Sequence, residues 1–71
     1  MNNTYQLFKS TDTADWYIVE TVDVYTVYYV ETKDKTKSDY VLFNNKLRMP
    51  VFVDKDYSKI TEFFNYKNIK K

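Results

Sequence analysis

The chain has 71 residues, with eleven Lys or Arg against ten Asp or Glu and a formal net charge of +1. This length fits one domain, residues 1–71, and the balanced charge indicates neither a general nucleic-acid binder nor a polyacid. The absence of Gly excludes glycine-rich phosphate loops, and the absence of Cys and His excludes the usual nucleophile–base pairs and zinc sites. We therefore expect a protein that is not an enzyme and that uses no metal or cofactor.

The first predicted elements are a short strand and a polar loop. Residues 4–10 alternate imperfectly, with Tyr5 and Leu7 on one side and Phe8 on the other. Residues 10–15 consist mainly of Ser, Thr and Asp, whose side chains bond to their own backbone, so this segment is predicted to be a loop.

The strongest β signal lies in residues 16–32. Nine of these seventeen residues are Ile, Val or Thr and five more are aromatic, which suits a pleated surface. One straight strand of this length would span roughly 53 Å, too long for a domain with a radius of gyration near ~11 Å. We expect two strand segments joined by a bend or short irregular break between Glu20 and Asp23, because no Asn-Gly or similar pair indicates a tight turn.

Alternation along this segment predicts two different faces. The even positions make one nearly apolar face, which Glu20 and Thr26 interrupt and which comprises Trp16, Ile18, Val22, Val24, Tyr28 and Val30. The odd positions mix acids, valines and tyrosines and comprise Tyr17, Val19, Thr21, Asp23, Tyr25, Val27, Tyr29 and Glu31. The even positions are therefore expected to face the core.

Two hairpins are predicted to follow. Residues 33–38 form a charged connecting loop, and residues 39–44 form the next strand. Asn44 and Asn45 both tolerate left-handed backbone and suit a type I′ turn. Residues 46–53 return as a strand, and Pro50 places this strand at an edge or at a bulge because proline lacks a backbone donor.

The period changes to that of a helix after residue 54. An apolar stripe at helical spacing comprises Tyr57, Ile60, Phe63 and Phe64. Asp54 or Asp56 can cap the helix. The sequence thus predicts an α+β domain, a mostly antiparallel sheet of four to five short strands with one C-terminal amphipathic helix packed on one face. That face is expected to include Trp16, Ile18, Val24 and Tyr28.

Charge is unevenly distributed along the chain. Between Ser10 and Thr32 there are five acids and no base. Carboxylates interleaved with tyrosines suit a protein interface, because Tyr supplies rigid contact area and the charges supply orientation. The candidate partner-binding residues are Asp12, Asp15, Glu20, Asp23, Tyr25, Tyr29 and Glu31. The competing interpretation is a solvated face whose charge prevents edge-to-edge association.

In its small size, its richness in Lys, Asn and Tyr, and its acidic strand segment at residues 12–31, the chain resembles the small early proteins with which bacteriophages disable host factors. The resemblance implies an inhibitor, in one version a DNA mimic. Its protein partner would carry a basic nucleic-acid-binding surface, as a nucleoid protein, a polymerase or a nuclease does.

Two further functions stay open. The chain could bind nucleic acid weakly through its lysine-rich loop and helix, by way of Lys33, Lys35, Lys37, Lys67, Lys70 and Lys71. It could also be a structural, self-associating protein, and we expect a homodimer in preference to a monomer because unpaired sheet edges gain stability by pairing. No apolar run approaches the ~20 residues of a membrane span, so we expect a cytoplasmic protein, located in the bacterial host cell if a phage encodes it.

Overall fold

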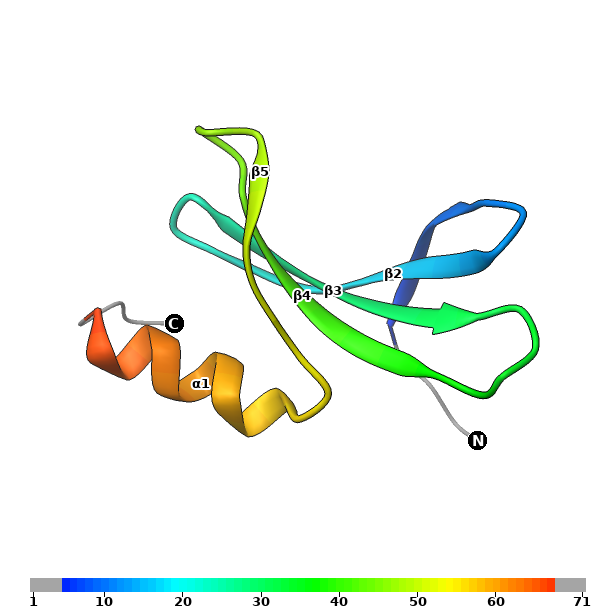
Figure 1. Ribbon diagram of the computed structural model, residues 1–71. Coiled ribbons are helices and arrows are strands. Elements are labelled where there is room, and N and C mark those ends of the chain that lie inside the picture. Colours follow the sequence, from blue (N-terminus) through cyan, green and yellow to red (C-terminus); the bar gives the residue numbers. More distant parts are fainter. Residues whose placement is uncertain (1–4, 68–71) are drawn as a thin grey trace.

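The computed structural model describes residues 5–67 and consists of one antiparallel sheet followed by one helix (Figure 1). The strands follow each other in the sheet in chain order, from β1 at one edge to β5 at the other. The elements are β1 (Gln6–Ser10), β2 (Ala14–Val22), β3 (Tyr25–Thr32), β4 (Ser38–Asn44), β5 (Met49–Asp54) and α1 (Tyr57–Tyr66). The predicted α+β architecture is confirmed.

The long β segment divides into β2 and β3 at a turn of two residues, Asp23 and Val24. Val22 pairs directly with Tyr25 across this turn, so it is tighter than the bend that the sequence favoured. Asp23 adopts a φ of 57°, a left-handed conformation that Asp tolerates better than most residues because its short side chain can bond locally. Val24 therefore lies in a turn and not on a strand face.

A bulge at Val19 reverses the alternation of β2. Ile18 lies opposite Tyr28, but the next paired residue, Glu20, lies opposite Val27, so the register shifts by one residue. Residues that lie directly opposite each other on paired strands have their side chains on the same face of the sheet. The even positions of β2 therefore lie on one face before the bulge and on the other face after it. The single apolar face expected from the even positions is thus wrong: Trp16 and Ile18 lie on one face, and Glu20 and Val22 on the other.

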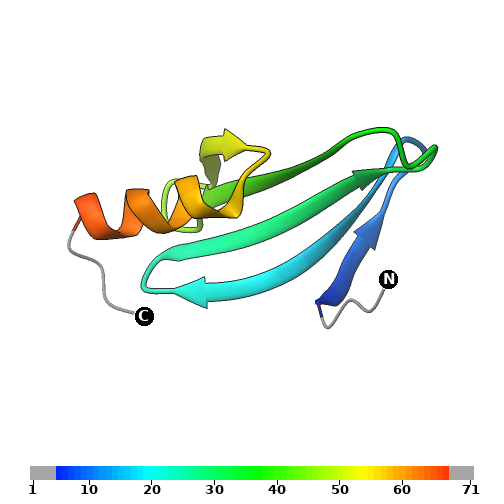
Figure 2. The ribbon, with the colours of Figure 1, turned by 90° about the horizontal axis from the view of Figure 1, so that it is seen from below.

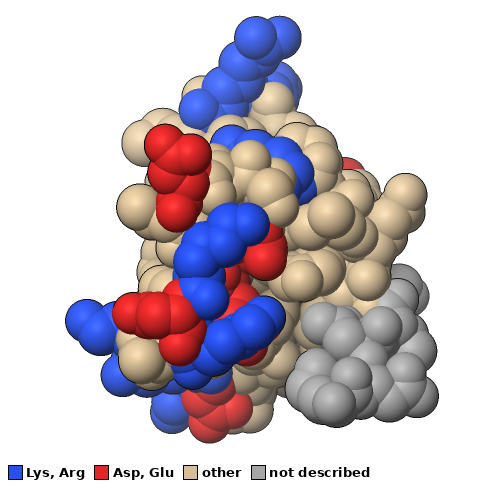
Figure 3. Space-filling model, turned by 90° about the vertical axis from the view of Figure 1, so that its right-hand side faces the viewer, with Lys and Arg blue, Asp and Glu red and all other residues tan. Residues whose placement is uncertain are grey.

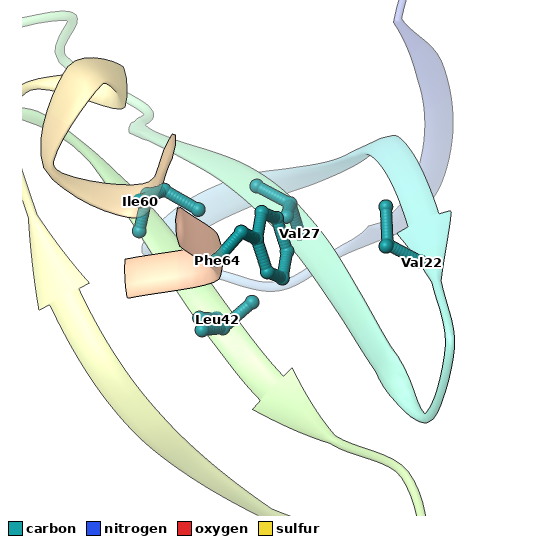
Figure 4. Packing of buried hydrophobic residues seen from close by; sticks show 5 residues of the cluster. All are labelled: Val22, Val27, Leu42, Ile60 and Phe64. Atoms are coloured by element: carbon teal, nitrogen blue, oxygen red, sulfur yellow. The ribbon is translucent and has the colours of Figure 1, made fainter. Parts of the chain in front are cut away.

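The helix contributes the side chains that complete the core. Ile60 and Phe64 are 0% and 1% exposed, and they pack against Val22, Val27 and Leu42 (Figure 4). The predicted stripe is confirmed in full, since Tyr57 and Phe63 pack at the margin of the same cluster. The predicted cap is confirmed for Asp56, whose carboxylate accepts a hydrogen bond of 3.0 Å from the backbone N–H of Ser58.

The sheet face that the helix covers differs from the expected one. The helix packs on the face of Val27 and Leu42, whereas Trp16, Ile18 and Tyr28 lie on the opposite face. Two features explain why the helix covers a different face. The bulge in β2 reverses the alternation of that strand, and both faces of β3 are apolar. The helix also lies towards β4 and β5, with β1 at the far side of the sheet (Figure 2).

The last hairpin has a longer turn than the Asn pair suggested. Residues 45–48 form the turn, and the Asn44 side chain accepts hydrogen bonds of 2.9 Å from the backbone N–H groups of Lys46 and Leu47. Pro50 lies opposite Phe43, next to a shift in register, on the edge strand β5. The expectation for this proline is confirmed.

Truncating the buried aromatic of the helix should nearly unfold the domain. Phe64→Ala is expected to lower the free energy of unfolding by ~3–5 kcal/mol, because it removes contacts in a core of few residues and leaves a cavity. Tyr66→Ala is the matched control, since this aromatic on the same helix is 85% exposed. Chemical denaturation of both variants measures the difference, and equal losses would contradict the packing described here.

Candidate functional site

Five tyrosines form a continuous row beside the helix, on the face of the sheet that the helix partly covers. Ring centroids lie 6.1 Å apart for Tyr17 and Tyr29, 5.2 Å for Tyr29 and Tyr40, and 5.3 Å for Tyr40 and Tyr57. Tyr5 joins the row through a ring contact of 5.8 Å with Tyr29 and a hydroxyl contact of 3.4 Å with Tyr40. We call these five residues the tyrosine row. All are half-buried, so each combines anchored and accessible surface.

The hydroxyl groups of Tyr40 and Tyr57 in the tyrosine row take part in hydrogen bonds. Burial, followed by the hydrogen bond with Tyr5, raises the pKa of Tyr40 well above its ordinary value. The hydroxyl of Tyr57 donates a hydrogen bond to the carboxylate of Glu20. Near neutral pH Tyr40 therefore keeps a neutral hydroxyl, which can donate as well as accept a hydrogen bond.

Acids and lysines meet at the end of the tyrosine row. Asp15 lies directly opposite Glu31 on the paired strands, an arrangement that is unfavourable for two like charges. The loop after β3 supplies the opposite charge. The Nζ atom of Lys33 is 2.8 Å from Asp15, and that of Lys35 is 3.3 Å from Glu31. We call these four residues the charge pairs.

The acidic segment therefore does not give a surface of one sign. The acidic segment has no base in its own sequence, but the loop that follows it folds back with two lysines. In the space-filling view of this end of the molecule, basic and acidic side chains are interleaved (Figure 3). The four charges of the pairs cancel, so the charge pairs make this end of the tyrosine row polar without adding net charge to it.

Only three of the seven predicted partner-binding residues, Asp15, Tyr29 and Glu31, lie together. Asp12 and Asp23 are exposed in the turns at opposite ends of β2. Glu20 lies beside the helix, where it accepts the hydrogen bond of Tyr57. Tyr25 packs on the helix, with ring centroids 5.8 Å and 6.0 Å from those of Phe63 and Phe64. Alternation placed Asp23, Tyr25, Tyr29 and Glu31 on one strand face, but in the structure they do not form a single patch.

The basic residues of the alternative surface are also dispersed. Lys33 and Lys35 are held by carboxylates, and Lys37 is exposed in the same loop. Lys67 follows the helix, with its Nζ atom 5.8 Å from the ring centroid of Phe63. Lys70 and Lys71 lie outside the described residues.

The loop that carries the lysines is ordered by one carboxylate. Asp34 accepts hydrogen bonds of 2.7 Å from the hydroxyls of Thr32 and Thr36, and one of 3.0 Å from the backbone N–H of Thr36. These donors stabilise the charged form and lower the pKa of Asp34 to about 2. Lys35 adopts a φ of 65° within this loop, and its pKa is raised by Glu31.

The opposite face of the sheet carries a second aromatic surface. It forms a cleft of about 440 Å³, lined by Phe8, Lys9, Trp16, Tyr28, Val41, Phe43, Pro50 and Val53. The rings of Phe8, Trp16 and Phe43 surround that of Tyr28, with centroids 5.2, 5.7 and 6.1 Å away. We call this surface the aromatic face. None of the described elements covers it.

Sequence reasoning missed the aromatic face because it assigned Trp16 and Tyr28 to the core. A signal was available, since apolar residues occupy both faces of the predicted strands while one short helix can cover only one of them. The surplus of apolar surface predicts a sheet face that the helix leaves uncovered.

Neither a cluster of metal-ligating side chains nor a membrane-spanning helix is found in the described part of the chain. Within residues 5–67, no group of acidic side chains is arranged to hold a metal ion. The helix described there is too short and too polar to cross a membrane.

No protein family model matches this chain. Comparison with curated proteins and with solved structures likewise gives no match.

Removing one lysine should change the acid titration of its partner. The hydrogen bond from Lys33, followed by that from Ser10, lowers the pKa of Asp15, so Lys33→Met should raise this pKa towards its ordinary value. NMR titration of the carboxyl carbons measures the shift. Asp34 is the internal control, because Thr36 and Thr32 lower its pKa and Lys33 does not.

The Asp15 carboxylate also makes the stability of the folded domain depend on pH. A lowered pKa in the folded state means that the stabilisation by Asp15 is complete above its unfolded pKa of ~3.9 and is lost as the pH falls through the folded value. Lys33→Met should therefore flatten the acid limb of the stability curve. An unchanged Asp15 titration in the variant would show that the ion pair does not form in solution.

Proposed function

We propose that the chain is a small, non-catalytic binding protein that occupies a surface of a larger protein through the tyrosine row and the adjoining charge pairs. The observation that carries this proposal is the row itself. Five half-buried tyrosines contact one another from β2, β3, β4, the helix and the segment before β1. Their side chains are held in place before any partner arrives.

This arrangement has the composition of an effective protein interface. Tyr contributes a large ring area at a low cost in conformational entropy, and its hydroxyl can bond to a partner. Contact with neighbouring rings reduces that cost further, because the rotamers are already fixed. The charge pairs lie at the end of the row, where a polar rim would orient a partner.

The charge layout bears on the kind of partner. Because Asp15 and Glu31 are neutralised by Lys33 and Lys35, a partner with charges of both signs fits better than a uniformly basic one. The narrower proposal, inhibition of a nucleic-acid-binding protein by imitation of phosphates, would require acids that are free of lysines. It therefore has less support from the geometry than protein binding as such.

Capture from a nuclease-treated lysate of the source cells, followed by binding kinetics with the captured protein, tests the proposal. Tyr17→Ala and Tyr29→Ala should each accelerate dissociation about 30-fold, as expected for an anchor worth ~2 kcal/mol. Melting curves of both variants confirm that they remain folded. Tyr66→Ala is the matched control and should leave the kinetics unchanged, because this exposed tyrosine lies outside the row.

Two results would contradict the proposal. One is equal dissociation rates for the row variants and for Tyr66→Ala. The other is retention of no protein after nuclease treatment, together with a gel shift of DNA or RNA that is lost when Lys33, Lys35 and Lys37 are changed to Glu. The second result would favour nucleic-acid binding.

A further inference from the structure

The aromatic face needs a cover that the described chain does not provide. Phe8 and Val53 are 49% and 53% exposed, and Trp16, Tyr28 and Phe43 are half-buried around the cleft. An apolar surface of this kind is rare on a monomer that has no partner. The face also lies on the opposite side of the sheet from the tyrosine row, so it is available while the row is occupied.

The strand register places two opposite charges at the ends of one row across this face. Lys9 lies opposite Trp16, Trp16 opposite Val30, and Val30 opposite Asp39. All four side chains therefore project from the same face, with a cation on edge strand β1, apolar side chains in the middle and an anion on β4. Within residues 5–67, neither Lys9 nor Asp39 takes part in an ion pair.

A row of this kind is complementary to itself. Rotation by 180° about an axis that lies in the interface, parallel to the strands, places Lys9 of one copy against Asp39 of the other, twice, and Trp16 against Val30. We propose that the aromatic face is the interface of a homodimer with twofold symmetry. This inference is independent of the proposed function, because it concerns the other face of the sheet.

The available area suits such a dimer. The two longer dimensions of the molecule are 36 and 23 Å, so the sheet face is of the size at which a typical stable interface buries ~800 Å² on each partner. The anatomy also fits, with aromatic rings in the centre and charges at the margin. Lys9 already lies 5.0 Å from the ring centroid of Trp16, which holds its ammonium group over the face. In this dimer the two tyrosine rows lie on the outer surfaces.

Sedimentation equilibrium from about 1 µM to about 500 µM provides the first measurement. As the concentration rises, the mass of the wild type should increase to twice 8.7 kDa. Trp16 is the only tryptophan, so its emission should shift to shorter wavelength along the same concentration curve as water leaves the interface. Phe8→Glu should abolish both changes. Leu47→Glu is the matched control, because Leu47 is 62% exposed in the turn after β4 and should not affect dimerisation.

Charge reversal provides the sharper test. Lys9→Glu sets two carboxylates against each other at both ends of the interface, and Asp39→Lys sets two ammonium groups there. Each variant alone should therefore dimerise at least about tenfold more weakly. A mixture of the two variants should form a heterodimer of near wild-type affinity, because each end then pairs either the two native charges or the two reversed ones. The double variant Lys9→Glu/Asp39→Lys should likewise form a homodimer.

Three results would overturn the inference. The first is a wild type that sediments at 8.7 kDa throughout the concentration range. The second is a dimer that Phe8→Glu and both single charge reversals leave intact, or whose formation leaves the Trp16 emission unchanged, since either would place the contact elsewhere. The third is failure of the mixed variants to associate when each alone is monomeric, which would exclude the twofold pairing of Lys9 with Asp39.

Discussion

The contact of Ile60 and Phe64 with Val27 and Leu42 is the interaction on which the rest of this structure depends. All four side chains are at most 1% exposed. A helix of ten residues is too short to be stable alone in water, where roughly 12–15 residues are needed, so α1 exists because it is docked on the sheet. The sheet in turn requires a second layer to bury one of its faces. Each element supplies what the other lacks, and the chain has no Cys with which a disulfide could form.

The size of the helix then determines what stays exposed. Ten residues extend about 15 Å, whereas five strands side by side span about 19 Å and the longest strand about 30 Å. The helix lies towards β4 and β5, so part of its own face is left to the tyrosine row. The opposite face receives no second layer from the described chain. Both candidate interfaces thus follow from covering a two-faced apolar sheet with one short helix.

Sequence patterns predicted the elements better than the surfaces. Strand propensity, the helical stripe with Ile60 and Phe64, and the cap at Asp56 are local properties, and all are confirmed. The covered face could not be predicted, because the bulge at Val19 reverses the alternation and no residue type marks it. The ion pair of Asp15 with Lys33 joins residues on different sides of a hairpin, so a count of charges along the sequence could not reveal it.

Turn chemistry explains why the acidic segment does not form an acidic surface. The chain has no Gly, and Asp23, Lys35 and Arg48 adopt left-handed backbone in its turns at a cost that other contacts must offset. At Lys35 this conformational cost is offset by the neighbouring Asp34, whose carboxylate accepts three hydrogen bonds from groups in and next to the same loop. The same loop geometry brings Lys33 and Lys35 back over the strands. Strand pairing sets Asp15 against Glu31, and the adjoining turn neutralises the repulsion that this register creates.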